Sequence, residues 1–218
     1  MPITVNDQAP AIDFVYIDDI VASILATIQG SGTGSKDILY PEPHYSIKIS
    51  QIADKLNSFK ESRLNFMVPE IADPFSKKLY STYLSYLDEG DFAYPLLAHK
   101  DQRGSFTEIL KTVGQGQISV NISKPGITKG NHYHMSKNEK YLVVSGTCEI
   151  KFRKVGTDNV ITYKCTGDDL KVVDIPPGYT HSITNVGKDD SVTLMWANEL
   201  YDPNVPDTIF LPVEETKK

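Results

Sequence analysis

The sequence predicts a mainly β protein, a barrel or sandwich of short strands that follows a smaller, mostly helical α/β segment. Up to about residue 90, apolar residues recur at intervals of three and four, as on one face of a helix. After residue 100 they alternate with polar residues, as in half-buried strands. The turns between these later runs contain glycine or proline, as in KPG, VSG and PPG. Many short strands separated by such turns are typical of all-β domains.

Three helices are expected before the strands begin. The aspartates at 18–19 precede an apolar run, where acidic residues favour a helix N-terminus, and Gly30 follows as a stop signal. Ser50 is the expected cap of a second helix over QIADKLNSF, and a third helix is expected over about 74–87. The alternating runs then lie at 118–122, 148–153, 161–165 and 191–200. We therefore expect two domains, 1–90 and 91–218.

Composition and charge limit the classes of partner. The 218 residues carry a net charge of −6, which argues against nucleic acid or an anionic membrane surface as the main partner. No apolar run reaches the roughly 18 residues that would span a bilayer. The first residues lack the basic-then-apolar pattern of a signal peptide. Two cysteines, Cys148 and Cys165, are too few for a disulfide framework, and we expect buried thiols in a cytoplasmic protein.

The stretch GNHYHMSKNEKYLVVSG, residues 130–146, contains two of the five histidines. Successive side chains of a strand point to opposite faces, so His132 and His134 share a face and Tyr133 points away. Glu139 lies at the start of the next predicted strand, and His181 follows a Pro-Gly turn. Three imidazole nitrogens and one carboxylate oxygen suit Zn, Fe, Ni, Mn or Co. A divalent metal site is predicted, with zinc as the expected ion.

The spacing of these residues resembles both halves of the cupin motif. The matching positions are Gly126, His132, His134, Glu139 and Gly146 in the first half, and Pro176, Gly178, His181 and Asn185 in the second. Leu170 departs from the pattern, since the family usually has a glycine there. The resemblance implies a jelly-roll β-barrel with His132, His134, Glu139 and His181 as ligands of an internal metal.

A second resemblance lies just upstream, in HKDQRGSFTEILK (99–111). The pattern Asp101-x-Arg103-Gly104-x-Phe106-x-Glu108 is similar to the opening signature of the dTDP-sugar 3,5-epimerases. It implies that Arg103 and Glu108 hold the nucleotide end of a substrate. A guanidinium suits a pyrophosphate, and Phe106 could stack on a base. A surface turn with an ion pair is the alternative reading of the same residues.

The first ninety residues resemble the late part of an extended short-chain dehydrogenase/reductase. The similar stretch is DFVYIDDIVASILATI (13–28), and no glycine-rich nucleotide-binding turn accompanies it. The segment is therefore expected to be a remnant of the reductase substrate lobe. Reductase activity is not expected from this chain, and NADPH is expected only in a full-length relative.

A reductase tail followed by a metal cupin resembles the CapF-type bifunctional enzymes of bacterial capsular polysaccharide synthesis. The similar segments are KKLYSTYLSYL, NISKPGITKGNHYH, NEKYLVVSG, VVDIPPGYTHSITN and NELYDPNVPDTIF. The resemblance implies C3 epimerisation of a UDP-4-keto-6-deoxy-N-acetylhexosamine, a step towards UDP-N-acetyl-L-fucosamine. It also implies a homodimer.

Epimerisation beside a ketone needs a base and an acid near the metal. Tyr141 should share the inward face of Glu139, while Lys129, Lys137 and Tyr179 flank the ligands at turns. These four are the candidate catalytic residues. Three alternatives stay open: an iron-dependent cupin dioxygenase, a non-catalytic cupin that binds a sugar nucleotide or dimerises, and a metal-free epimerase in which His132 or His134 is the base.

Overall fold

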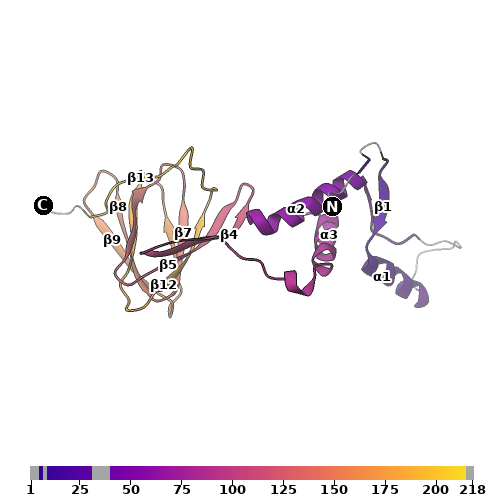
Figure 1. The fold of residues 1–218 in the computed structure, drawn as a ribbon, viewed down its shortest axis with the longest axis horizontal. Helices are drawn as coiled ribbons and strands as arrows, with labels where there is room; N and C mark the ends of the chain where they lie inside the picture. Colours follow the sequence, from indigo (N-terminus) through magenta and orange to yellow (C-terminus); the bar gives the residue numbers. More distant parts are fainter. Residues whose placement is uncertain (1–4, 7–8, 31–39, 215–218) are drawn as a thin grey trace. The chain divides into compact units, whose positions relative to one another are not determined.

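The computed structural model describes residues 5–6, 9–30 and 40–214, which form two compact units. The first unit comprises Met1–Asn65 with Pro69–Ala93, and the second comprises Phe66–Val68 with Tyr94–Lys218. Within the described residues, every helix is too short or too polar to cross a membrane. Figure 1 shows the helices in the first unit and nearly all strands in the second.

The described part of the first unit combines three α-helices and a short 3₁₀ helix with a small antiparallel sheet. Its elements are β1 (Ile12–Val15), α1 (Ile17–Ile28), β2 (His44–Ile47), α2 (Ile49–Asn65), α3 (Pro74–Ser85) and the 3₁₀ helix η1 (Glu89–Asp91). The three predicted helices are confirmed. No bounds were predicted for strands β1 and β2, because four residues are too few to show a period.

The predicted cap of the second helix is wrong. Ser50 lies inside α2, which begins at Ile49, and the side chain of Gln51 accepts a hydrogen bond of 3.2 Å from the backbone N–H of Lys48. By contrast, α3 begins as its sequence suggests. Asp73 accepts from the backbone N–H of Ser76 at 2.8 Å, and proline occupies the first turn, where its missing donor does no harm.

The second unit consists of two antiparallel sheets that face each other, and the mainly β prediction is confirmed. One sheet has the order β10-β7-β12-β5-β4-β3, and the other β13-β6-β11-β8-β9. In chain order the strands are β3 (Ala98–Asp101), β4 (Gly104–Thr112), β5 (Gly116–Ser123), β6 (Thr128–Tyr133), β7 (Glu139–Ser145), β8 (Thr147–Lys154), β9 (Val160–Thr166), β10 (Val172–Ile175), β11 (Tyr179–Asn185), β12 (Ser191–Ala197) and β13 (Ile209–Phe210).

An apolar core fills one part of the space between the sheets. Its buried members are Tyr141, Val143, Cys148, Ile150, Phe152, Cys165, Val173, Ile175 and Ile183. Both cysteines are buried free thiols, as predicted, and they lie opposite each other on β8 and β9. The core anchors β7 and β11, the strands from which two of the predicted ligands project.

Strand β5 reverses the usual orientation of a half-buried strand. Its polar residues Ser119, Asn121 and Ser123 are buried, whereas Ile118, Val120 and Ile122 on the opposite face are half-buried. Register places Val120 beside Leu194 and Ile118 beside Trp196 on the same outer face. The interior is therefore polar on this side, and the outside of the same sheet is apolar.

Candidate metal centre

Three strands bring the predicted ligands together. His132 is on β6, Glu139 is the first residue of β7, and His181 is on β11, directly opposite His132. The register between β6 and β11 shifts at this point, and Asn131, with φ of 60°, is the extra residue of the bulge. Bulges re-aim side chains next to functional sites. This bulge sets the direction of His132, which strand alternation alone would not determine.

Close backbone contact at the bulge requires a glycine. Gly130 has φ of +100°, and a Cβ atom there would lie 2.7 Å from the carbonyl oxygen of His181. A side chain would therefore push β6 away from β11, and glycine also tolerates this φ without strain. The two strands that carry ligands are held at a separation that only glycine permits.

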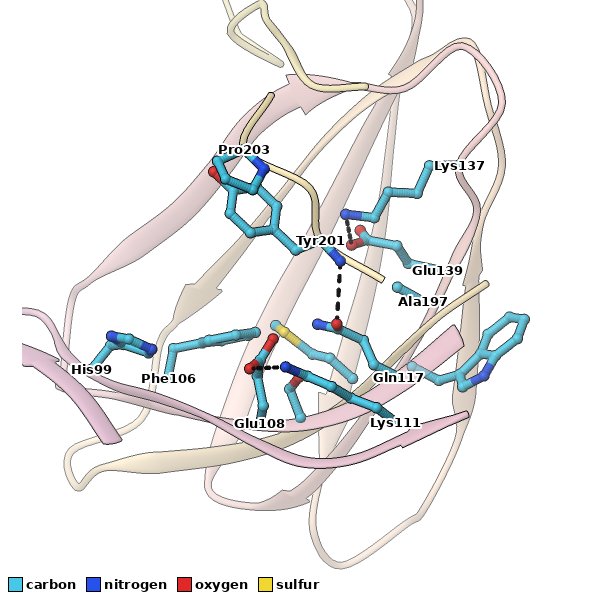
Figure 2. Close-up of a pocket in the computed structure, with 13 residues that line it drawn as sticks. His99, Phe106, Glu108, Lys111, Gln117, Lys137, Glu139, Ala197, Tyr201 and Pro203 are labelled. Carbon is cyan, nitrogen blue, oxygen red and sulfur yellow. Dashed lines mark hydrogen bonds and ion pairs between the residues drawn. The ribbon is translucent and has the colours of Figure 1, made fainter. Parts of the chain in front are cut away.

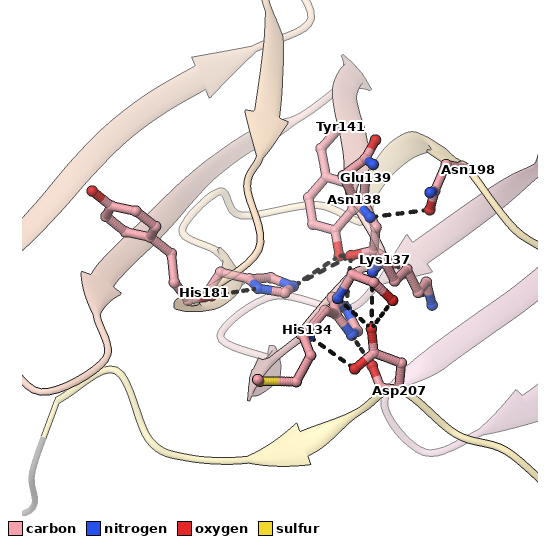
Figure 3. A network of polar contacts seen from close by, with 11 residues as sticks. His134, Lys137, Asn138, Glu139, Tyr141, His181, Asn198 and Asp207 are labelled. Atoms are coloured by element: carbon pink, nitrogen blue, oxygen red, sulfur yellow. Dashed lines mark hydrogen bonds and ion pairs between the residues drawn. The ribbon is translucent and has the colours of Figure 1, made fainter.

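The four side chains converge inside the barrel. One ligand atom from each of His132, His134, Glu139 and His181 lies within 4.8 Å of the others. Oε2 of Glu139 is 3.5 Å from Nε2 of His134 and 3.4 Å from Nε2 of His181. The side chains of His134 and His181 are 2% and 1% exposed. Figure 3 shows Glu139, His134 and His181 pointing toward one another.

Charge within the cluster is unevenly distributed. Burial would raise the pKa of Glu139, but contacts with His134 and His181 hold it well below its usual range. Burial and the neighbouring imidazoles lower the pKa of His132 to about 4. Burial also opposes the charged form of His134, yet contacts with Glu139 and the Asp207 carbonyl raise its pKa. An anionic carboxylate therefore lies beside a neutral His132.

These residues fit a divalent cation. Nε2 of His134 is buried and has no hydrogen-bond partner among the residues that the structure describes, although buried polar atoms normally have one. Its Nδ1 faces the carbonyl oxygen of Asp207, and Nδ1 of His181 is 3.5 Å from the carbonyl of Tyr179. Both rings thus direct Nε2 at the cluster. The donor set of three imidazole nitrogens and one carboxylate suits Zn and neighbouring transition metals.

A cavity of about 590 Å³ opens beside Glu139. It is lined by His99, Phe106, Glu108, Lys111, Gln117, Ser119, Lys137, Glu139, Met195, Trp196, Ala197, Tyr201 and Pro203 (Figure 2). A cavity of this size accommodates a ligand of ordinary metabolite size. Because Glu139 belongs to both the cavity wall and the cluster, a molecule bound in the cavity would meet the cluster at Glu139.

The predicted substrate anchors separate into two places. Phe106 and Glu108 line the cavity, whereas Arg103 is not among the described residues that line it. Arg103 instead pairs with Asp101 at 2.7 Å at the β3–β4 turn. A register shift in β4 between Glu108 and Leu110 turns Lys111 to the cavity side, where it pairs with Glu108 at 2.7 Å. The bulge thus creates a charged pair that strict alternation would have divided between two faces.

The four candidate catalytic residues also separate. Lys137 lines the cavity, with Nζ 3.4 Å from Oε1 of Glu139. The Tyr141 hydroxyl is buried, donates to Glu139 at 2.9 Å, and has its pKa raised by burial and by that carboxylate. Lys129 donates to Asn121 at 2.6 Å, and burial lowers its pKa. Tyr179 packs against the apolar core. Of the four, only Lys137 is in the described lining of the cavity.

Several cavity residues were not predicted from the sequence. His99 pairs directly with Phe106 across the β3–β4 hairpin. The short turn at 102–103 could have predicted this hairpin, and with it the position of His99 beside Phe106. Gln117 and Tyr201 meet through a 3.3 Å bond from the Tyr201 backbone N–H. They are far apart in the chain, and local pattern offers no signal for such a contact.

Comparison with known proteins identifies close relatives. The family described as the polysaccharide biosynthesis C-terminal domain matches residues 99–209, just over half of the chain. A UDP-2-acetamido-2,6-beta-L-arabino-hexul-4-ose reductase of Pseudomonas aeruginosa is 40% identical over 215 residues, which is 99% of this chain and 58% of the relative. The spore coat polysaccharide biosynthesis protein SpsL of Bacillus subtilis is 24% identical over 55% of this chain and 86% of its own length.

A solved structure agrees over nearly the whole chain. The capsular polysaccharide assembling protein CapF of Staphylococcus aureus superposes with a TM-score of 0.91 at 54% identity, covering 97% of this chain and 62% of that protein. The predicted resemblance to CapF-type proteins is confirmed, and so is a mainly β fold preceded by a helical part. The chain spans about three fifths of the length of the Pseudomonas aeruginosa reductase and of CapF.

Proposed function

Because the chain belongs to the polysaccharide biosynthesis C-terminal domain family, we propose that it is a metal-dependent sugar-nucleotide epimerase of capsular or surface polysaccharide synthesis. The proposed reaction inverts C3 of a UDP-4-keto-6-deoxy-N-acetylhexosamine. The observation that carries the proposal is the convergence of three histidines with Glu139, which also lines a cavity beside Lys137. The name of the Pseudomonas aeruginosa relative describes a UDP-linked 4-keto sugar, the same substrate class.

A divalent cation, with zinc as the first choice, would be held by His132, His134, Glu139 and His181. Such an ion acts as a Lewis acid that stabilises negative charge developing on a carbonyl oxygen. Another CapF structure contains the inhibitor 3-isopropenyl-tropolone. Tropolones present a carbonyl and a hydroxyl oxygen side by side, a pair that chelates divalent cations. The proposed ion would bind an oxygen pair of this kind.

Lys137 is the residue that we propose for proton transfer at C3. Its ammonium nitrogen lies 3.4 Å from Glu139, and its side chain is only 16% exposed. Inversion requires a second group on the other face of the sugar ring. Figure 2 shows Lys137 across the cavity from Glu108, Lys111 and His99. One of these ionisable residues would return the proton from that side.

Phe106 and Glu108 are the proposed contacts to the sugar nucleotide. Both line the cavity on the wall away from Glu139. Arg103 is proposed to reach the diphosphate from the tip of the same hairpin, since in the described part of the chain its guanidinium uses Nε and one terminal nitrogen on Asp101. A guanidinium has five N–H donors, and the remaining ones can bind phosphate oxygens.

We also propose that the protein is a homodimer through the outer face of the sheet that contains β5. The half-buried apolar residues of this face are Leu110, Ile118, Val120, Ile122, Leu142, Val192 and Leu194. Strand register aligns them across β4, β5, β12 and β7. A continuous apolar face of this kind marks an interaction surface. This face is also what favours the second candidate function, a barrel whose role is to dimerise and hold the nucleotide.

Solvent deuterium incorporation at C3 of the 4-keto sugar tests the proposal. We expect the wild type to incorporate deuterium. His132→Ala should lose both deuterium incorporation and the metal, whereas Lys137→Gln should lose incorporation and retain the metal. Lys140→Gln is the matched control, since Lys140 pairs with Asp174 outside the described cavity lining. Metal binding without incorporation would favour the non-catalytic barrel. Metal-dependent oxygen consumption would indicate a dioxygenase instead.

A further inference from the structure

Segment 198–210, which follows the last long strand, is tied to the elements that carry the metal ligands. Asn138 and Asn198 are joined by two hydrogen bonds, one of 3.0 Å to the Asn198 side chain and one of 3.1 Å to the Asn138 carbonyl. At the far end, Phe210 of β13 pairs with His132 of β6. Asp207 lies between these two attachments.

We infer that Asp207 is a positioning residue that sets the orientation of His134 and the conformation of the 135–137 turn. The inference deepens the proposed function and depends on the metal centre described there. Asp207 would not touch the substrate or the ion. It would act through His134, a predicted ligand, and through the turn from which Lys137 extends into the cavity.

The Asp207 carboxylate accepts hydrogen bonds from the backbone N–H groups of the turn. Oδ1 accepts from the N–H of Met135 at 2.8 Å, and Oδ2 accepts from the N–H groups of Ser136 and Lys137 at 2.8 Å each. The Ser136 hydroxyl also donates to Oδ2 at 3.0 Å. Figure 3 shows these bonds converging on Asp207. Because all of them favour the charged form, they hold the pKa of Asp207 well below its usual range.

The backbone of Asp207 contacts the other side of the same turn. Its carbonyl oxygen accepts from Nδ1 of His134, which requires that the proton of the ring be on Nδ1. Nε2, buried and without a hydrogen-bond partner in the described part of the chain, is then the nitrogen that offers its lone pair to the cluster. Ligating histidines are commonly oriented by such a bond, and loss of the supporting contact typically weakens metal affinity about 10–100-fold.

The two contacts reinforce each other because they come from one residue. Three N–H bonds fix where Asp207 lies relative to the turn, and this placement holds its carbonyl at the His134 ring. Removing the carboxylate charge would free the turn and allow the carbonyl to move. His134 would then lose its fixed orientation even though its own side chain is intact.

Cobalt affinity, measured against a competing chelator, tests the inference. We expect Asp207→Asn to bind Co²⁺ about 10–100-fold more weakly than the wild type, with an altered visible spectrum. Asp202→Asn is the matched control. Asp202 lies in the same segment, but within the described residues its carboxylate accepts from Asn204 alone, at 2.8 and 3.0 Å. Asp202→Asn should bind within about twofold of the wild type.

Each outcome decides a different question. A wild type that binds cobalt, with Asp207→Asn binding equally well, overturns the inference and leaves the proposed function intact. A wild type that binds no cobalt contradicts the metal centre itself. If Asp207→Asn does not fold, Ser136→Ala replaces it, since this change removes only the hydroxyl bond to Oδ2. We expect roughly two- to fivefold weaker binding there, and unchanged affinity would overturn the inference.

Discussion

The Tyr141 hydroxyl lies 2.9 Å from Oε2 of Glu139, the same oxygen that faces Nε2 of His134 and of His181. Tyr141 is 5% exposed, so its hydroxyl does not face solvent, and it also lies 3.4 Å from Nε2 of His181. Because burial raises its pKa, the phenol stays protonated at neutral pH and donates to the carboxylate. Tyr141 is thus better placed to orient Glu139 than to exchange protons with a ligand in the cavity.

Tyr141→Phe should weaken metal binding about tenfold, because Glu139 loses the donor that orients its carboxylate. Zinc or cobalt competition with a chelator measures the effect. Tyr163→Phe is the control, since Tyr163 is 51% exposed on β9. Equal affinity of Tyr141→Phe and the wild type would show that the hydroxyl is not needed to orient the ligand.

Gly130→Ala should destabilise the barrel by about 1–3 kcal/mol and lower metal affinity. The new Cβ would meet the His181 carbonyl at 2.7 Å, in a backbone conformation that disfavours alanine. Gly156→Ala separates the effect of the backbone conformation from that of the steric contact. Gly156 also has positive φ, +82°, but a Cβ there meets nothing within 4 Å. Thermal melts and metal titrations of both variants should show the loss of affinity in Gly130→Ala alone.

Glu108→Gln should raise the KM for the keto sugar roughly tenfold, about 1.4 kcal/mol of binding, and leave metal affinity unchanged. Glu108 lines the cavity and pairs with Lys111 rather than with the four clustered residues. Steady-state kinetics and metal titration are the two measurements. Glu149→Gln on β8, outside the described cavity lining, should change neither. A fall in metal affinity in Glu108→Gln would contradict the proposal that Glu108 binds the sugar nucleotide rather than supporting the metal.

Leu194→Asp should convert a dimer into a monomer, because it places a charge in the centre of the apolar sheet face. Leu194 is flanked by Val120 on β5 and Leu142 on β7. Light scattering during size-exclusion chromatography measures the mass. Val186→Asp, at a 45% exposed position outside this face, should leave the mass unchanged. A monomeric wild type would contradict the proposed interface.

Removing the metal should lower the melting temperature of the barrel. Ligand present at about 100 times its dissociation constant stabilises a protein by about 2.7 kcal/mol, and a chelator removes that contribution. Calorimetry with and without chelator measures the shift. In Glu139→Gln the chelator should have little effect, because the one carboxylate of the described cluster is gone.

Short-range pattern determined the strand-rich fold and the four residues of the candidate metal centre. His132 and His134 lie two positions apart in an extended segment, and turn residues frame Glu139 and His181, so local geometry was informative. Helices were predicted by their period, although Ser50 was assigned a capping role that Gln51 performs from the first turn. Features that depend on two or three neighbouring residues were therefore accessible without a structure.

Tertiary structure alone decided how those residues work together. The bulge at Asn131 aims His132, the register shift in β4 brings Lys111 to Glu108, and Asp207 reaches a turn 70 residues earlier in the chain. The inward orientation of the polar face of β5 was equally hidden, because alternation shows two faces without saying which is inside. Contacts between distant segments depend on the register of strands and on where later segments pack against earlier ones. Neither is encoded in a local pattern.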